Sequence, residues 1–277
     1  MPVDSTSANA LIVEKVSSML VEPLAAASVV LAANPTVFQS SEPLRVPTLT
    51  GNTNPEWVGE NELIPEADNL TFGEIELMPT NRKSIKTITR VSNELVRMAK
   101  IGVSEVLQRR LVADVRDKLD TALLVGDGAD NSVTGIINQP GVTNAAWDVA
   151  DPDSILDGLA TLAASEVSPT RILMNGTDFF SLRKLKDGDG RGLLQSDLTA
   201  EATYRIHGVP VTVTNKLPAG TLVAANWADI AVVRDQDTTV RLDSSRYLEY
   251  DQTAIRVTAR YDLGILRPAG VLVMETV

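Results

Sequence analysis

The sequence has 277 residues, which is enough for one large domain or for two lobes that share a core. Apolar residues make up 44% and charged residues 22%, which is ordinary for a folded protein and excludes a chain that is disordered throughout. The net charge of -11 argues against a general binder of nucleic acid or anionic lipid. The absence of cysteine excludes disulfides and thiol catalysis, and His207 as the only histidine excludes a histidine-rich metal site.

Proline usage divides the chain. Eight of the 14 prolines lie in the first 79 residues, and none lies between residues 80 and 139. Because prolines about every ten residues interrupt long helices and central strands, we expect this front part to form an extended arm and a projecting loop. Residues 8–20 are the exception, since a short amphipathic helix is predicted there, and it packs either on its own molecule or on a neighbour. Its apolar face consists of Leu11, Ile12, Val16, Met19 and Leu20.

Two stretches that follow alternate apolar and polar side chains, residues 70–78 and 82–91, with Pro79 to Asn81 between them. This pattern predicts a long two-stranded hairpin. Residues 51–81 hold seven acids and no base, whereas residues 82–93 hold four bases and no acid. These charges either pair across the hairpin, at about 0.2–1 kcal/mol a pair, or face a neighbouring molecule.

A stretch without proline predicts a long helix from about residue 92 to residue 124, ended by Gly126. Arg116 and Asp120 are spaced to form an ion pair on its solvent side. An apolar residue recurs every four positions, so the apolar stripe winds around the helix and meets different neighbours along its length. The stripe consists of Leu107, Leu111, Val115, Leu119 and Leu123.

The rest of the chain mixes both element types, so the expected fold class is α+β. Asp151-Pro152 opens a predicted helix, and a second, short helix is expected around residues 179–185. The side chains expected to point inward from the first helix are Ile155, Leu156, Leu159 and Leu162, and the short helix contains Phe179, Phe180, Leu182 and Leu185. Strands are predicted over residues 171–174, 209–214, 221–225, 230–234, 239–243, 254–260 and 271–275.

Motifs for catalysis or cofactor binding are missing from the sequence. It contains no GxSxG, no GxGxxG after a strand, no phosphate-binding loop and no HExxH. The run from Asp187 to Arg191 starts like a calcium loop but places Arg191 at a ligand position. We therefore predict a protein that is not an enzyme and has no cofactor or metal. A hydrolase whose carboxylates meet only on folding is the alternative.

Nucleic-acid and membrane binding are not indicated either. Aromatic residues make up 4% of the chain and are not interleaved with the basic ones, which disfavours a base-stacking surface. The longest apolar stretch, residues 24–33, is about half of the roughly 20 residues that a spanning helix needs. The first fifteen residues also lack the positive region that begins a secretory signal.

Six segments, in this order, resemble the major capsid proteins of tailed bacteriophages, whose fold was first seen in Hong Kong phage 97. They are WVGENELIPEADNLTFGEIELMP (57–79), SNELV (92–96), LLVGDGADNSVTGIIN (123–138), RKLKDGDGRGLL (183–194), HGVPVTVTNKLPAG (207–220) and RYDLGILRPAGVLVM (260–274). The first segment looks like the extended loop of that family, the second like the entry to its spine helix and the third like the turn after that helix. The fourth and fifth look like axial-domain elements, and the sixth looks like the final strands.

The resemblance implies a domain organisation. It gives an N-terminal arm (1–48), an extended β-hairpin loop (49–91), a peripheral domain with the spine helix (92–127 and 232–265) and an axial domain (128–231 and 266–277). It also implies a subunit of the virion capsid that assembles in the host cytoplasm as hexamers and pentamers into an icosahedral shell. Its partners would be further copies of itself, a separate scaffolding protein, a portal and a decoration protein, and it would enclose DNA without specific binding and without a membrane.

We expect the arm and the loop to hold such a shell together by non-covalent contacts. The residues expected at these contacts between subunits are Leu11, Ile12, Val16, Met19, Trp57, Glu60, Glu66, Asp68, Lys83, Lys86 and Arg90. An encapsulin-type nanocompartment shell, which shares the fold, is the alternative. The well-developed arm favours the virus.

Two departures from the family pattern sharpen this expectation. Some members link a loop lysine to an asparagine of a neighbour, but here Asn61 stands after Glu60 and no asparagine lies around Tyr247. We therefore predict shells without isopeptide crosslinks. Other members begin with a long helical scaffolding region, whereas this sequence starts with Met1-Pro2 directly on the arm, so a separate scaffolding protein is expected.

Overall fold

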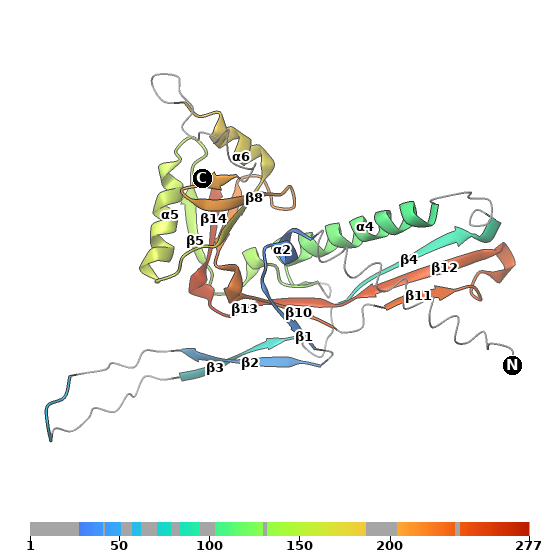
Figure 1. The fold of residues 1–277 in the computed structure, drawn as a ribbon, viewed down its shortest axis with the longest axis horizontal. Helices are drawn as coiled ribbons and strands as arrows, with labels where there is room; N and C mark the ends of the chain where they lie inside the picture. The colour runs from blue at the N-terminus through green and yellow to red at the C-terminus, as the bar shows by residue number, and fades with distance from the viewer. Residues whose placement is uncertain are drawn as a thin grey trace.

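The computed structural model describes residues 28–40, 42–50, 57–61, 71–78, 84–94, 103–129, 132–186, 204–235 and 239–276. The predicted helix over residues 8–20, with Leu11, Ile12, Val16 and Met19, lies outside these ranges, as do Glu66, Asp68, Lys83 and the loop at 187–192. The molecule is elongated, with a compact domain at one end, a long helix lying along strands, and a projecting pair of strands (Figure 1).

The compact part is built on a six-stranded sheet in the order β5-β14-β9-β6-β8-β7. Its strands are β5 (Thr143–Trp147), β14 (Val271–Thr276), β9 (Thr221–Ala225), β6 (Arg171–Met174), β8 (Val209–Val213) and β7 (Arg205–Ile206). Helices α5 (Asp153–Ala164) and α6 (Gly176–Arg183) pack in one apolar cluster with one face of this sheet. Leu156, one of the residues predicted to point inward, instead lies exposed on the outer side of α5, because its neighbour Ile155 contacts the sheet.

The elongated part consists of α4 (Val103–Val125) and a three-stranded sheet in the order β11-β12-β4. The strands are β11 (Thr239–Asp243), β12 (Gln252–Ala259) and β4 (Ile85–Ser92). The end of the long helix and the burial of Leu111, Val115, Leu119 and Leu123 are confirmed. These side chains share one cluster with Val257 and Ile85, so the winding stripe joins the helix to the inner face of this sheet.

A third sheet, in the order β1-β10-β13, lies between these two parts (Figure 1). It contains β1 (Thr36–Gln39), β10 (Ile230–Arg234) and β13 (Tyr261–Ile265), and β1 follows the single turn of α2 (Val29–Ala32). Val30 and Ala33 are buried in the central cluster. Residues 28–39, which the sequence placed in the arm, therefore pack on the body of their own molecule, because β1 adds to the open side of β10.

The prediction that residues 70–78 and 82–91 form one hairpin is wrong, although both stretches contain a strand. β3 (Thr71–Leu77) pairs antiparallel with β2 (Leu44–Thr50), whereas β4 pairs with β12. The chain turns away at Met78, which has a φ of 56° and donates its N–H to the buried Asp262 carboxylate (2.7 Å). This bond fixes the end of β3 on β13, so the next strand enters another sheet.

Because β3 and β4 belong to different sheets, the described acids of β3 do not lie opposite the bases of β4, as pairing across one hairpin would require. Glu74 pairs instead with Arg45 of β2, at 3.3 Å and in solvent. The pair predicted between Arg116 and Asp120 is also wrong, since Arg116 contacts Asp117 (2.8 Å) and Asp120 is buried, where it accepts hydrogen bonds from the start of α2.

Strands β1, β2, β5 and β7 were not predicted, and β13 was indicated only by the resemblance of residues 260–274 to the final strands of phage capsid proteins. β13 continues almost directly from β12 and is buried along its whole length, with Tyr261, Leu263 and Ile265 in the central cluster and Asp262 bonded to Met78 on the other face. The described part of the chain contains no helix that is both long and apolar enough to cross a membrane.

Candidate intersubunit surfaces

The β2–β3 hairpin has two different faces. Leu44 and Val46, which lie opposite Leu77 and Ile75, face the body near the root of the hairpin and pack with the β1-β10-β13 sheet. The opposite face is exposed, and Phe72 on it is 83% accessible. We call this face the loop surface, and its described residues are Arg45, Pro47, Phe72, Glu74 and Glu76.

The root of the hairpin is closely packed. Leu77 and Met78 are almost fully buried. Gly264 of β13 is needed here, because a Cβ at that position would lie 2.4 Å from Leu77 Cδ2 and 3.3 Å from Ile75 Cγ2. The Asp262 carboxylate also accepts from the backbone N–H of Leu263 (3.0 Å). The hairpin therefore projects in a defined direction, although its own strands make few contacts beyond the root.

The outer face of the β11-β12-β4 sheet is basic. Lys86, Ile88 and Arg90 alternate with inward residues on β4, and the strand register places Arg256 beside Ile88 and Arg241 beside Arg256. All four basic residues are exposed, and Ile88 is 48% accessible between them. We call Lys86, Arg90, Arg241 and Arg256 the basic face, which is notable in a chain of net charge -11.

One acid, Asp243, lies on the described part of this face, and its carboxylate accepts hydrogen bonds from a residue close in sequence. Its carboxylate accepts from Ser245 Oγ (2.6 Å) and from the Ser245 N–H (2.9 Å). The Ser245 hydroxyl bond, followed by the backbone bond, holds the pKa of Asp243 below its usual value, so Asp243 stays charged at neutral pH. The face still carries a net positive charge.

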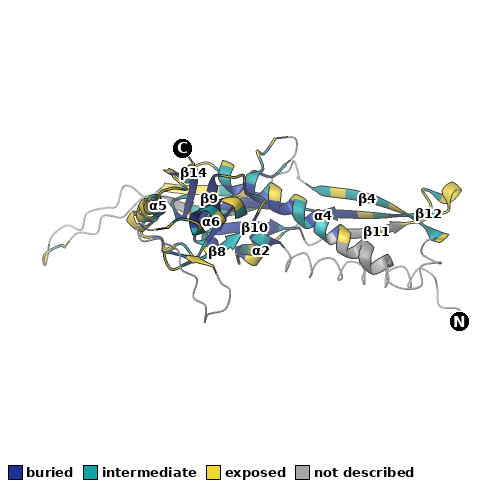
Figure 2. Ribbon diagram, turned by 90° about the horizontal axis from the view of Figure 1, so that it is seen from above, coloured by how far each residue is buried: buried dark blue, intermediate teal, exposed yellow. Residues whose placement is uncertain are grey.

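The turn at the far end of this sheet is largely exposed (Figure 2). Arg90 lies over the ring of Tyr247, 4.5 Å from its centroid. Leu248 and Tyr250 of the adjoining turn are 78% and 69% accessible. Asn93 holds the turn by donating to the Asp251 carboxylate (2.7 Å). This end is therefore a third surface that nothing in the described part of the chain covers.

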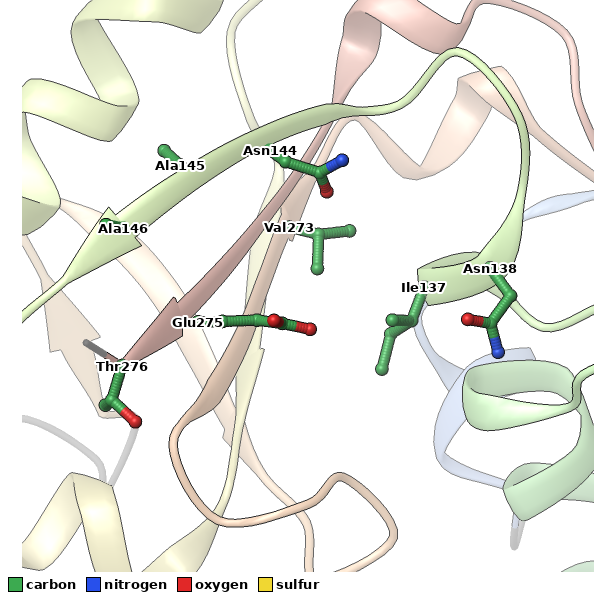
Figure 3. A pocket seen from close by; sticks show the side chains of 8 residues that line it. All are labelled: Ile137, Asn138, Asn144, Ala145, Ala146, Val273, Glu275 and Thr276. Atoms are coloured by element: carbon green, nitrogen blue, oxygen red, sulfur yellow. The ribbon is translucent and has the colours of Figure 1, made fainter.

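An open groove lies beside β5 and β14 on the compact part of the molecule. The open groove of about 550 Å³ beside β5 and β14 has Glu275 as its acidic side chain and no basic or nucleophilic partner (Figure 3). Its lining consists of Ile137, Asn138, Asn144, Ala145, Ala146, Val273, Glu275 and Thr276. Among the residues that the structure describes, no group of three or more His, Asp or Glu could hold a metal ion.

Four of the residues predicted at subunit contacts can be placed. Lys86 and Arg90 come together on the basic face, and Trp57 and Glu60 are exposed in the described stretch 57–61 beyond the hairpin. Sequence reasoning missed Arg241 and Arg256, which complete the basic face. The alternation of residues 239–243 and 254–260 indicated strands, but only the register reveals that their bases lie beside those of β4.

A spine helix on a three-stranded sheet, a compact domain on a six-stranded sheet and a projecting hairpin together define the subunit fold of tailed-phage capsids. The chain belongs to the phage capsid family, whose model matches residues 8–276. The fold class and the family expected from the sequence are thereby confirmed.

Individual relatives agree with this assignment. The chain is 26% identical over 256 residues to the major capsid protein of Enterobacteria phage HK97, covering 87% of this chain and 62% of the relative. It is 22% identical over 226 residues to that of Halomonas phage phiHAP-1, covering 80% of this chain and 36% of the relative. The chain thus spans about one to two thirds of the length of these relatives.

Solved structures show the same fold. The capsid of a native GTA particle superposes with a TM-score of 0.74 at 18% identity, covering 89% of each chain. A structure of Microbacterium phage Oxtober96 superposes with a TM-score of 0.73 at 16% identity, covering 90% of this chain and 91% of the other.

Proposed function

We propose that this chain is the major capsid protein of a tailed bacteriophage, and that it assembles as hexamers and pentamers into an icosahedral shell around the genome. The observation that carries this proposal is the presence, on one elongated subunit of the phage capsid fold, of an acidic projecting hairpin and a basic sheet face that cannot reach each other within one copy (Figure 1). Surfaces of this kind are satisfied by neighbouring copies.

The extended-loop contact is the first element of the proposal. The loop surface carries Glu74 and Glu76 together with Arg45, which pairs with Glu74 in solvent, and Glu60 is a further exposed acid, while the basic face carries four cations. Laying the loop of one subunit across the sheet of the next pairs these charges and covers Phe72 and Ile88. Lys86, Arg90, Trp57 and Glu60 contribute to this contact, and Glu66, Asp68 and Lys83 extend it.

The N-terminal arm is the second element. Residues 28–39 pack on their own body, so the contact with a neighbour is assigned to the part of the arm that precedes residue 28. The apolar side chains of Leu11, Ile12, Val16 and Met19 pack on the neighbouring subunit. The organisation into arm, extended loop, peripheral domain and axial domain is otherwise proposed as the sequence indicates it.

The role proposed for this chain is structural, and no catalysed reaction is proposed for it. Its further partners are a separate scaffolding protein, a portal and a decoration protein. Genome loading falls to a separate motor, and the acidic chain encloses DNA without binding specific sequences. A nanocompartment of the encapsulin type is the second candidate. The phage capsid relatives favour the virion.

Electron microscopy of the purified chain, alone and with its scaffolding protein, tests the proposal. Closed shells of megadalton mass are expected, and a discrete small oligomer with hydrolytic turnover would contradict it. A denaturing gel of intact particles should show the monomer band without a covalent ladder, since Asn61 replaces the crosslinking lysine.

A charge exchange tests the loop contact itself. Glu74→Arg with Glu76→Arg should prevent shell formation, and so should Arg241→Glu with Arg256→Glu, because like charges then meet between copies. Combining all four changes in one chain should restore assembly. The matched control is Glu275→Arg on the compact domain, which should assemble normally.

A further inference from the structure

Asp120 is an acidic side chain enclosed within the body. It is 1% exposed, whereas Asp114 and Asp117 on the same helix are about half exposed. A buried carboxylate is costly unless hydrogen bonds compensate it. Its partners in the described part of the chain all belong to the start of α2, which lies more than 90 positions earlier in the sequence.

These bonds form a compact clamp. Ser28 Oγ donates to Asp120 Oδ1 (2.5 Å), and the backbone N–H groups of Val29 and Val30 donate to the two carboxylate oxygens (3.0 and 3.5 Å). Ser28 Oγ also accepts from the N–H of Leu31 (3.2 Å), so it caps α2 while it binds Asp120. We call Asp120 and Ser28 the arm-root clamp.

The single turn of α2 connects three parts of the molecule. Its start is bound to α4 by the arm-root clamp, and its Ala32 carbonyl accepts from Arg171 Nη1 of the six-stranded sheet (3.4 Å). Directly afterwards, Thr36 Oγ1 donates to the Ala228 carbonyl (2.8 Å) as β1 joins β10. Ser28 is itself fully buried, so the described part of the arm begins at a fixed point of the body.

We propose that Asp120 is a positioning residue for assembly, which fixes through Ser28 where the N-terminal arm leaves the body. This inference rests on the proposed function. An arm that docks on a neighbour sets the angle between two subunits only if its root is rigid, because a loose root allows many relative orientations. The clamp provides that rigidity and couples the arm to the spine helix and to the compact domain.

The chemistry of the clamp requires a carboxylate. Asparagine offers one acceptor oxygen in place of two, and its amide hydrogens would face the donors of residues 28–30. Asp120→Asn therefore removes part of the clamp without changing the size of the side chain. Ser28→Ala is the milder variant, since it removes the bridging hydroxyl and leaves the two backbone donors in place.

Hydrogen exchange on assembled particles, combined with electron microscopy, tests the proposal. In Asp120→Asn and in Ser28→Ala, the amides of residues 29–32 should exchange roughly ten- to a hundredfold faster than in the unsubstituted chain. Most particles should be open or irregular. The matched control is Asp178→Asn, which removes another buried carboxylate, one that accepts from the Gly220 N–H (2.6 Å) in the compact domain. At a similar loss of melting temperature, it should still give uniform shells.

The outcomes are distinct. If both clamp variants form shells as uniform as those of the unsubstituted chain, this inference is overturned and the proposed function stands. If Asp178→Asn disturbs the shells to the same extent, the effect is one of general stability and the inference also fails. If Asp120→Asn does not fold, Ser28→Ala decides. If the unsubstituted chain never closes into shells, the proposed function itself is wrong.

Discussion

The β2–β3 hairpin and the six-stranded sheet are both made of short strands, but they depend on different partners. In β9 all five residues are buried, because strands lie on both sides and apolar clusters cover both faces. In β3 the first four residues are exposed, and only its end is buried at the root. An isolated two-stranded hairpin is marginal in water, so we expect its outer part to gain order from a neighbour. The comparison separates residues that fold the subunit from residues that serve the shell.

The largest effect on folding is expected in the six-stranded sheet. Leu173→Ala removes a fully buried side chain of β6 and leaves a cavity, so the free energy of unfolding should fall by about 2–5 kcal/mol. Chemical denaturation of unassembled subunits measures this change. A loss below about 0.5 kcal/mol, the range usual for surface substitutions, would show that this sheet does not carry the stability of the subunit.

An intermediate effect is expected at the root of the hairpin. Gly264→Ala places a methyl group 2.4 Å from Leu77 Cδ2, and the resulting overpacking should cost about 1–3 kcal/mol. Combining it with Leu77→Ala should cost less than the sum of the two single changes, because the smaller side chain leaves space for the new methyl group. Additive costs would contradict direct contact at this root.

A small effect on folding but a large effect on assembly is expected on the loop surface. Phe72→Ala removes a side chain that is 83% exposed, so the stability of the unassembled subunit should change by less than about 0.5 kcal/mol. The yield of closed shells should nevertheless fall strongly, as counted by electron microscopy. Phe180→Ala, also at an exposed phenylalanine but on α6, is the matched control and should leave the yield higher.

The smallest effect is expected where the compact domain meets the spine helix. Burial raises the pKa of Asp117, but hydrogen bonds from Arg116 and Lys216 outweigh it and hold the pKa below its usual value of 3.8. Lys216 Nζ lies 3.1 Å from the carboxylate, which is 42% exposed, so solvent screens the pair and its contribution is about 0.2–1 kcal/mol.

The pH dependence of that pair follows from the direction of the shift. A carboxyl group whose pKa is lower in the folded chain than in the unfolded chain stabilises the folded chain at any pH above the unfolded-state pKa. This stabilisation is lost as the pH falls through the folded-state pKa. The melting temperature of Asp117→Asn should therefore lie slightly below that of the unsubstituted chain at neutral pH, and the difference should shrink as the pH falls below 3.8 and vanish in strong acid. A difference that persists in strong acid would rule out this origin.

The positions of most elements followed from local patterns in the sequence. The strands at 221–225, 230–234 and 239–243 have the predicted limits, and the long helix ends where Gly126 follows it. These features depend on neighbouring residues, on the period of apolar side chains and on the backbone preferences of glycine and proline, all of which can be read locally.

Strand pairing and the fate of single charges required the tertiary structure. The alternation in residues 70–78 and 82–91 identified two strands, but their partners were chosen by the turn at Met78 and the buried bond to Asp262. Asp120 has the spacing of a surface ion pair, yet residues 28–30 cover it.

The sequence by itself thus determined the type of element along most of the chain, the α+β class and the resemblance to phage capsid proteins. Only the tertiary structure decided that β3 pairs with β2, that the bases of three strands share one face, and that the arm is anchored at Ser28. The physical reason is that secondary structure follows from interactions a few residues apart, whereas pairing and burial depend on contacts between residues far apart in sequence, such as Ser28 and Asp120.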